Sequence, residues 1–501
     1  MKRSNETGEP REMVSSISHA KVSSKSLKGI RIVNFCIALL LFLGNVVIQS
    51  WALGRQELPD PPDEGVYLYQ AKLITQGYLP YRDFAMTSHV PFLMYLNAFV
   101  LKLCSFNMLA YHFIYVAWVF LTIFPLFYTV LYFTDSRLAS IFSIVLFSTF
   151  AEFVQWDAHF FAIREASFPF FACFIYFFFV ERKEKLSYIF LSLFSFCLIT
   201  NFFISLVFVI TVFLYGCMKH RRSIEEWIKK YIRTCWVFVL LTGTYFCLVA
   251  LIPGSLSNLL AVQKDIYPYL QRLIDVKDMM SLNWPIFLFG TLGILFSIKK
   301  IPLLSLLSIL TLLITAFISG SFYPHYLSII AVPFAIMGGI SISKILRILN
   351  SNEIKIAFIG MFLIALYQTV YSNLAWNLIT ETTPDFFQTV RVLEHSPEPL
   401  FTLQPIYALY AHKNLVMYYN TAEMRVFRVM GTNLSYEEYH AILNRSNTVL
   451  LEPFADQMLP QRIKEELFQN YDLKYTDGTE RVYVKKAVMR NFMPSFILDR
   501  T

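Results

Sequence analysis

Long runs of apolar residues recur along most of this chain, and they limit what it can fold into more than any other feature. The clearest runs are Phe35–Trp51, Phe113–Phe133, Phe168–Val180, Trp236–Ile252 and Ile356–Tyr371. Several reach the roughly 20 residues that a helix needs to cross the hydrocarbon core of a bilayer. Only 16% of the 501 residues are charged, whereas soluble globular proteins carry about 25%. The sequence therefore predicts an α-helical polytopic membrane protein.

Lysine and arginine residues gather between these runs, and their placement predicts the orientation of the chain. The basic clusters lie at residues 21–31, 182–185, 219–233, 299–300 and 344–355. Because basic residues beside membrane spans favour the cytoplasm, we assign every cluster to that side. The chain changes side at each span, so keeping every cluster inside gives about eleven crossings, with the N-terminus cytoplasmic and the C-terminus extracytoplasmic. The expected spans cover residues 32–53, 110–133, 137–151, 161–180, 186–200, 201–218, 235–253, 284–298, 301–319, 325–342 and 354–374. The net charge of +8 could suggest a nucleic-acid partner, but the placement of the basic residues beside the spans indicates orientation in the membrane instead.

The stretch Leu186–Met218 tests this assignment, because it is apolar throughout and has basic clusters on both sides. A single tilted helix would place one of those clusters outside. A hairpin that turns near Thr200-Asn201 keeps both inside, although its arms are shorter than a standard span. We predict the hairpin, with its short arms sheltered by neighbouring helices.

The polar segments divide the chain into three parts. We expect a cytoplasmic tail over residues 1–31 and a transmembrane module over residues 32–374, with a first outer loop at residues 54–91. Residues 375–501 have a water-soluble composition and the size of a small domain. Strands are predicted at Leu400–Leu403, Thr448–Leu451 and Arg481–Val484, and helices at Asp385–Leu393, Tyr436–Leu443 and Pro460–Asn470. Asp477-Gly478 suits a hairpin turn. The sequence thus predicts a small α/β domain outside the membrane.

Ionisable side chains are nearly absent from the apolar runs at mid-depth and gather instead at one membrane surface. The group comprises Asp63, Glu64, Arg82, Asp83, His89, Glu152, Asp157, His159, Arg164, Glu165, Lys264 and His325. Ion-coupled transporters usually need such residues near the midplane. The pattern therefore favours a reaction centre at the outer interface. A flippase or transporter for lipid-linked sugars and a non-catalytic membrane scaffold stay open as alternatives.

Two acids open a helical segment in the first outer loop. Pro59-Asp60-Pro61-Pro62 stiffens the approach to them, since proline fixes φ and restricts its predecessor. One interpretation makes Asp63 a helix N-cap, with Glu64 complementing the helix dipole. The other places a carboxylate at the lipid–water boundary, where partial desolvation raises its basicity. The two are compatible, because a capping bond also fixes the side chain.

The same loop carries a recognisable set of residues: Asp63-Glu64-Gly65, Tyr67, Ala71, Gly77, Pro80-Tyr81-Arg82-Asp83 and Ser88-His89-Val90-Pro91. A second set, Phe322-Tyr323-Pro324-His325-Tyr326, precedes an apolar span. Together they resemble the GT-C glycosyltransferases, in the branch of the protein O-mannosyltransferases and the lipid A aminoarabinose transferase. The resemblance implies a multispanning bundle, juxtamembrane helices in the first outer loop and a C-terminal outer domain. It also implies that a sugar is taken from a polyprenyl-phosphate carrier.

The resemblance also suggests roles for individual residues. Asp63 matches the first-loop acid, the general base or acceptor-orienting group, and Glu64 is the fallback. Asp157 is the choice for a second acid in the next outer loop, with Arg164-Glu165 as its rival. The residues expected to contact the donor phosphate or the substrate are His89, Arg82, Lys264, His325, Tyr326, Arg164 and Glu165. Relatives often carry Lys-Pro-Pro where this chain has His89-Val90-Pro91, and a neutral histidine is a weaker phosphate partner than lysine.

The implied reaction is a single displacement that inverts the anomeric centre, with Asp63 accepting the proton of the attacking group. The partners would be a polyprenyl-phosphate-linked sugar, a glycan, lipid or protein acceptor, and the bilayer. We expect no cofactor. Asp157, His159 and the first-loop acids leave a divalent metal open, but they lack tight ligand spacing, so none is predicted. The seven cysteines have no CxxC spacing and are interpreted as packing residues. The expected location is a prokaryotic plasma membrane.

Overall fold

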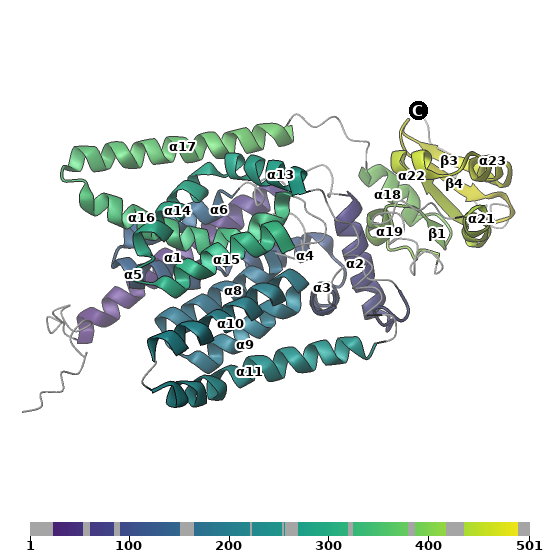
Figure 1. The fold of residues 1–501 in the computed structure, drawn as a ribbon. Helices are drawn as coiled ribbons and strands as arrows, with labels where there is room; N and C mark the ends of the chain where they lie inside the picture. The colour runs from purple at the N-terminus through teal and green to yellow at the C-terminus, as the bar shows by residue number, and fades with distance from the viewer. Residues whose placement is uncertain are drawn as a thin grey trace, which may run out of the picture.

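The computed structural model describes residues 24–53, 61–84, 91–150, 165–220, 223–252, 255, 269–318, 324–378, 386–416 and 435–488. Within these ranges a helical bundle forms one side of the molecule, and a small domain with a β-sheet forms the other (Figure 1). Helix α2 (Pro61–Thr75) lies between the two.

Helices make up nearly all of the bundle. They are α1 (Ser24–Leu53), α3 (Phe92–Leu103), α4 (Met108–Phe120), α5 (Ile123–Thr134), α6 (Arg137–Ser148), α8 (Phe168–Ile175), α9 (Glu184–Cys197), α10 (Ile199–Lys219), α11 (Ile224–Ala250), α13 (Tyr269–Leu282), α14 (Trp284–Ser297), α15 (Pro302–Ile318), α16 (Ala331–Ile348) and α17 (Asn352–Leu378). A short 3-10 turn, η1 (Glu165–Ser167), precedes α8, and a π-helical turn, η2 (Tyr176–Val180), follows it. The 3-10 helix η5 (Pro324–Ile330) leads into α16.

Every expected span coincides with one of these helices or with consecutive helical segments. Among the described residues, five helices are long and apolar enough to cross a membrane, or six if the bent pair of α13 and α14 is one span. Further apolar helices, including α6 and α15, are shorter. The chain is therefore an integral membrane protein, and the count of about eleven crossings stays a prediction. Helix α3 was not anticipated, because twelve residues are too few for a span.

The expected hairpin is present, but its turn lies slightly earlier than predicted. Leu198 adopts an extended conformation, with φ −150° and ψ 150°, and separates α9 from α10. The ring of Phe178 contacts both Tyr188 on α9 and Phe208 on α10. These two residues lie equally far before and after Leu198, so the chain reverses there and the arms lie side by side.

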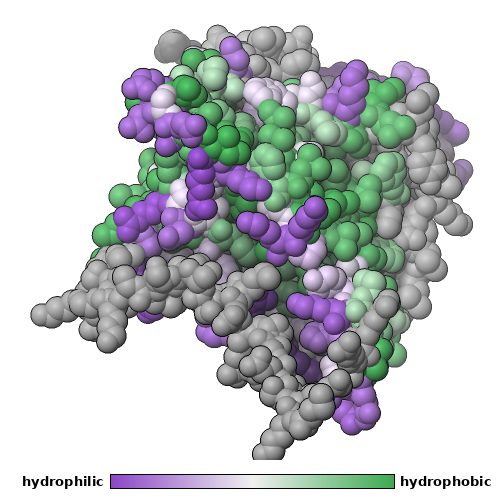
Figure 2. Space-filling model, turned by 60° about the vertical axis from the view of Figure 1, so that its left-hand side comes forward, coloured by the Kyte–Doolittle hydropathy of each residue, from purple (hydrophilic) through white to green (hydrophobic). Residues whose placement is uncertain are grey.

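The basic clusters face one end of the bundle, where the predicted orientation needs them. Four side-chain contacts join helix termini at this end. They are Arg347 to the carbonyl of Thr134, Lys344 to the carbonyl of Phe296, Arg137 to Asn34, and Lys230 to Glu184. Figure 2 brings the left-hand side of Figure 1 forward and shows hydrophilic groups over an otherwise largely apolar face. The C-terminal domain lies at the opposite end (Figure 1).

Helix α16 forms the centre of the bundle. Buried residues make up 78% of the most apolar stretch of Leu327–Ile348, which contains α16. They make up only 22% of the corresponding stretches of α1 and α11. A Cβ added at Gly293 of α14 would lie 2.0 Å from the carbonyl oxygen of Met337, so glycine allows the two backbones to touch. On the other side, the Ser143 hydroxyl of α6 donates to the carbonyl of Ala335 at 2.7 Å. Close approach of small residues and interhelical hydrogen bonds both stabilise helix pairs in membranes.

The C-terminal domain contains a four-stranded sheet in the order β1-β2-β4-β3. Its strands are β1 (Leu400–Phe401), β2 (Thr448–Leu451), β3 (Tyr471–Thr476) and β4 (Arg481–Lys485). Its helices are α18 (Phe386–Glu394), α19 (Pro405–Tyr410), α21 (Tyr436–Arg445), α22 (Pro453–Met458) and α23 (Gln461–Asn470). The predicted strands and helices of this region are confirmed, and β3, α19 and α22 are additional. Gly478 has φ +101°, as the predicted hairpin turn requires.

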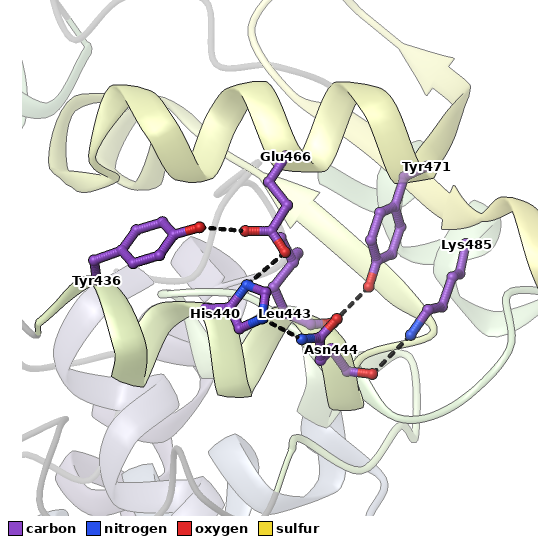
Figure 3. Close-up of polar contacts among 7 residues, drawn as sticks. All are labelled: Tyr436, His440, Leu443, Asn444, Glu466, Tyr471 and Lys485. Carbon is purple, nitrogen blue, oxygen red and sulfur yellow. Dashed lines mark hydrogen bonds and ion pairs between the residues drawn. The ribbon is translucent and has the colours of Figure 1, made fainter.

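A polar network fastens α21 to the rest of this domain (Figure 3). His440 Nδ1 lies 2.7 Å from a carboxylate oxygen of Glu466 on α23, and the Tyr436 hydroxyl donates to the other oxygen at 3.3 Å. Tyr471 and Lys485 donate to the carbonyls of Leu443 and Asn444 at 2.6 and 2.7 Å. These carbonyls belong to the last turn of α21, where the regular helical bond to the fourth following residue is missing. The Leu443 carbonyl also accepts from the Ser446 amide at 3.0 Å. The network therefore caps the C-terminal end of α21 and connects this helix to α23 and to strands β3 and β4.

Candidate functional site

Helix α2 carries the two candidate acids on its first turn. Pro61 and Pro62 begin the helix, where a fixed φ and a missing N–H cost nothing. An N-cap at Asp63 would make Glu64 the first helical residue. The helix starts three residues earlier, at Pro61, and the N-cap interpretation of Asp63 is wrong. Asp63 and Glu64 lie within the first turn, where negative charge interacts favourably with the helix dipole. Their side chains lie outside the part of the chain that the structure describes.

Helix α3 follows the Ser88–Pro91 motif and is anchored to the bundle by aromatic rings. The amide of Phe92 donates to the Tyr245 hydroxyl of α11 at 3.1 Å. The ring of Phe92 lies 5.8 Å from Phe196 and 6.3 Å from Phe170, centre to centre. Phe170 in turn lies 5.4 Å from Trp118. Residues of α3, α4, α8, α9 and α11 therefore meet at the end of the first outer loop.

A buried carboxylate joins two segments that the sequence marks separately. Glu165 is 1% exposed, and one of its carboxylate oxygens accepts a hydrogen bond from the Ser328 hydroxyl at 2.5 Å. Ser328 belongs to η5, which also contains His325 and Tyr326. The carbonyl of Ala166 accepts from Trp118 Nε1 at 2.9 Å. The end of the second outer loop is thus bonded to the Pro-His-Tyr segment and to the aromatic group around Phe92.

Arg82 is held by its neighbour in the sequence. Its guanidinium donates two hydrogen bonds to Asp83, at 2.9 and 2.8 Å. The bonds from Arg82 lower the pKa of the Asp83 carboxyl, as does a bond from the amide of Leu79. The side chain of Arg82 is 54% exposed, so the pair contributes little to stability. This geometry leaves Arg82 accessible at the surface of the loop.

Several predicted site residues fall outside the described part of the chain. They are His89, Asp157, Arg164 and Lys264. The backbone of His325 and Tyr326 is described within η5, but their side chains are not. Among the described residues, no group of three or more His, Cys, Asp or Glu side chains could hold a metal ion. The roles assigned to these residues stay predictions.

The structure reveals a contact that the sequence did not suggest, between α2 and the C-terminal domain. Helix α2 packs against α19 and against the segment that follows it. Lys72 Nζ donates to the carbonyl of Lys413 at 2.6 Å, and the amide of Leu415 donates to the Tyr69 hydroxyl at 2.8 Å. These residues are more than 300 positions apart, and no local pattern links them.

Buried acids lie next to this contact in the C-terminal domain. Glu452 is fully buried and accepts hydrogen bonds from the Leu403 amide at 3.0 Å and the Thr402 hydroxyl at 3.3 Å. Burial, together with the nearby Glu480, raises the pKa of the Glu452 carboxyl to about 8. Glu480 accepts a hydrogen bond from the hydroxyl of Tyr407, a residue of α19.

These features together define a class: a membrane-embedded helical bundle with two outer helices, the first of which contacts a C-terminal domain. The solved structure of ArnT from Cupriavidus metallidurans in the apo state shares this fold, with a TM-score of 0.61 and 12% identity over 93% of this chain and 99% of that chain. The structure of the same ArnT bound to undecaprenyl phosphate gives a TM-score of 0.61 and 13% identity, over 91% of this chain and 98% of that chain. No family model and no curated protein matches the chain. The resemblance expected from the sequence is thus confirmed at the level of the overall fold.

Proposed function

We propose that this protein transfers a sugar from a polyprenyl-phosphate donor to an acceptor at the extracytoplasmic face of the membrane. The observation that carries the proposal is the likeness to ArnT along nearly the whole chain, since one of those structures holds undecaprenyl phosphate. The arrangement of charge supports it. The first-loop acids lie at the end of the bundle opposite the basic clusters, where a lipid phosphate and a water-soluble acceptor meet.

In the proposed reaction, the hydroxyl or amine of the acceptor attacks the anomeric carbon of the sugar. The bond between that carbon and the phosphate oxygen breaks, and the polyprenyl phosphate leaves with the bonding electrons. Asp63 accepts the proton of the attacking group. The anomeric centre inverts, because a single displacement occurs from the face opposite the leaving phosphate. Glu64 and Asp157 assist in binding or orienting the acceptor.

The leaving phosphate gains charge as the bond breaks, and cations near the outer boundary would stabilise it. We assign this role to His89, Arg82, Lys264 and Arg164, with His325 and Tyr326 on η5. Glu165 contributes indirectly, because its bond to Ser328 fixes η5 beside the start of α8. No cofactor is proposed, and the sugar and the acceptor are left open.

Binding of the donor lipid tests the proposal directly. The purified full-length protein in lipid nanodiscs is mixed with undecaprenyl phosphate or with undecaprenol, and the bound lipid is measured by native mass spectrometry. We expect saturable binding of the phosphate and much weaker binding of the alcohol. Equal retention of both lipids would contradict a site that recognises the donor phosphate.

A further inference from the structure

The contact between α2 and the C-terminal domain extends along most of the helix. Near its start, Gly65 lies against Ile406 of α19. Near its end, Lys72 and Tyr69 are bonded to the segment around Lys413 and Leu415, and Gln76 Nε2 lies 3.4 Å from the side-chain oxygen of Asn414. Contacts at both ends fix the helix against rotation as well as displacement.

Gly65 allows the closest approach in this contact. A Cβ placed on Gly65 would lie 2.5 Å from the backbone nitrogen of Ile406 and 2.9 Å from its Cβ. Both distances are shorter than van der Waals contact, and backbone atoms cannot move aside as a flexible side chain can. Glycine is costly inside a helix, by roughly 1 kcal/mol relative to alanine. The glycine that follows the two acids is therefore explained by the approach of α19.

Lys72 fastens the other end of the contact. Its side chain is buried, its Nζ donates to the Lys413 carbonyl at 2.6 Å, and it lies 5.3 Å from the centre of the Tyr69 ring. Burial lowers the pKa of the Lys72 amine to about 8, while the nearby Glu398 acts in the opposite direction. A buried amine is costly unless it is hydrogen-bonded, so this residue contributes mainly when the domain is docked.

We propose that Gly65 and Lys72 are positioning residues, through which the C-terminal domain sets the place of the acids on the first turn of α2. This inference rests on the proposed transferase activity. Asp63 and Glu64 directly precede Gly65 in the same helix, so a shift of α2 away from α19 moves their backbone with it. A displacement of about 1 Å at a catalytic group can lower a rate by about 100-fold. The domain would then belong to the catalytic centre without touching the substrate.

The test compares Gly65→Ala, Lys72→Met and Gly360→Ala in the full-length protein. Gly360 is the matched control, because it lies in helix α17 and a Cβ there would meet nothing within 4 Å. Three quantities are measured for each variant: hydrogen exchange in α2 and residues 411–416, the Kd for undecaprenyl phosphate, and kcat and KM for sugar transfer per donor-binding site. Normalising to donor-binding sites removes the effect of unfolded protein.

For Gly65→Ala and Lys72→Met, we expect faster exchange in both segments, a kcat that is lower by about 10- to 100-fold, and a donor Kd within about twofold of wild type. Gly360→Ala should behave as wild type. Wild-type kcat in a variant whose exchange has risen would overturn the inference, because undocking would then leave the acids in place. A lower kcat without faster exchange would also overturn it, as would two variants in which neither quantity changes. If the wild-type protein neither binds the lipid phosphate nor transfers sugar, the proposed function fails instead.

Discussion

Asp63 lies in the first turn of α2, where its charge has two separable consequences. As a first-turn acid, it stabilises the helix by about 0.3–1 kcal/mol through its interaction with the helix dipole. As a general base, it would contribute a factor of about 10²–10⁴ to the rate of transfer. Asp63→Asn keeps the shape of the side chain and removes its charge. We therefore expect transfer to fall by about 10²–10⁴-fold, with folding and donor binding retained, in an assay with a defined polyprenyl-phosphate donor.

Two neighbouring acids serve as controls for that measurement. Glu64→Gln should cost less than Asp63→Asn, and Asp60→Asn should cost least, since Asp60 precedes the helix. Thermal stability is followed in parallel. Near wild-type turnover in a well-folded Asp63→Asn protein would remove this residue from the catalytic role.

Glu452 gives the C-terminal domain a predictable response to pH. Its folded-state pKa of about 8 lies above the ordinary value of 4.5 for a glutamic acid, so the folded state binds one more proton between these two pH values. The stability from this proton is fully present below pH 4.5 and is lost as the pH rises through 8. Glu452→Gln removes the titration and retains an acceptor for the Leu403 amide.

The two proteins should therefore differ in the pH dependence of unfolding. We expect wild type to lose stability between pH 5.5 and 8.5, on the order of a few kcal/mol, and Glu452→Gln to lose much less. Thermal unfolding at the two pH values measures the difference, and the loss that remains in Glu452→Gln gives the contribution of the other titrating groups. Equal losses in the two proteins would contradict the assignment.

At the scale of helices, the packing of α14 on α16 is the contact with the least tolerance. Gly293→Ala would place a methyl group 2.0 Å from the carbonyl oxygen of Met337, so the two helices must separate. Overpacking of this kind typically costs about 1–3 kcal/mol. We expect a lower unfolding temperature in detergent for Gly293→Ala than for Gly44→Ala, whose added Cβ meets nothing within 4 Å. An unchanged temperature would show that α14 can move without loss.

The helices were predictable to different degrees, for physical reasons. Apolar length and flanking charge predicted the position of a helix at each expected span, because a bilayer imposes both on a sequence. The sequence predicts the hairpin turn near Thr200-Asn201, because these residues are polar. The turn lies at Leu198, and an apolar residue gives no sign in the sequence that its backbone is extended. Helix α3 was missed because it is apolar but too short to span. Three of the four strands after Pro399 were predicted from their composition, and β3 was missed.

The candidate site was predictable only where a local motif exists. Asp63, Glu64 and Gly65 stand together in the sequence, and the outer loop resembled that of known transferases. The reason for Gly65, a backbone from the far end of the chain, could not be seen. Likewise, Glu165 was noted as a rival to Asp157, but its partner Ser328 lies 163 residues away. Contacts at such separations have no periodicity or spacing from which to infer them.

Orientation is a property of the whole molecule, and labelling with an impermeant thiol reagent tests it. The residue Ser223 lies at the basic end and is exposed, and Thr479 is exposed in the C-terminal domain. Since basic residues favour the cytoplasm, Ser223→Cys should be labelled only after permeabilisation and Thr479→Cys in intact cells. The protein without added cysteines gives the background, and the reverse pattern would invert the topology.

The distance along the chain between Lys72 and its acceptor sets an order of events during synthesis. Lys413 is made 341 residues after Lys72, which takes on the order of half a minute at about 5–20 residues per second. Throughout that interval the bundle can insert and pack, but the surface of the C-terminal domain that contacts α2 has not yet been synthesised. A chain released early by a premature stop codon after Leu378 would hold every described helix of the bundle and still lack that surface. Under the positioning that we propose, the enzyme becomes active only after the C-terminal domain has been synthesised and has docked on α2.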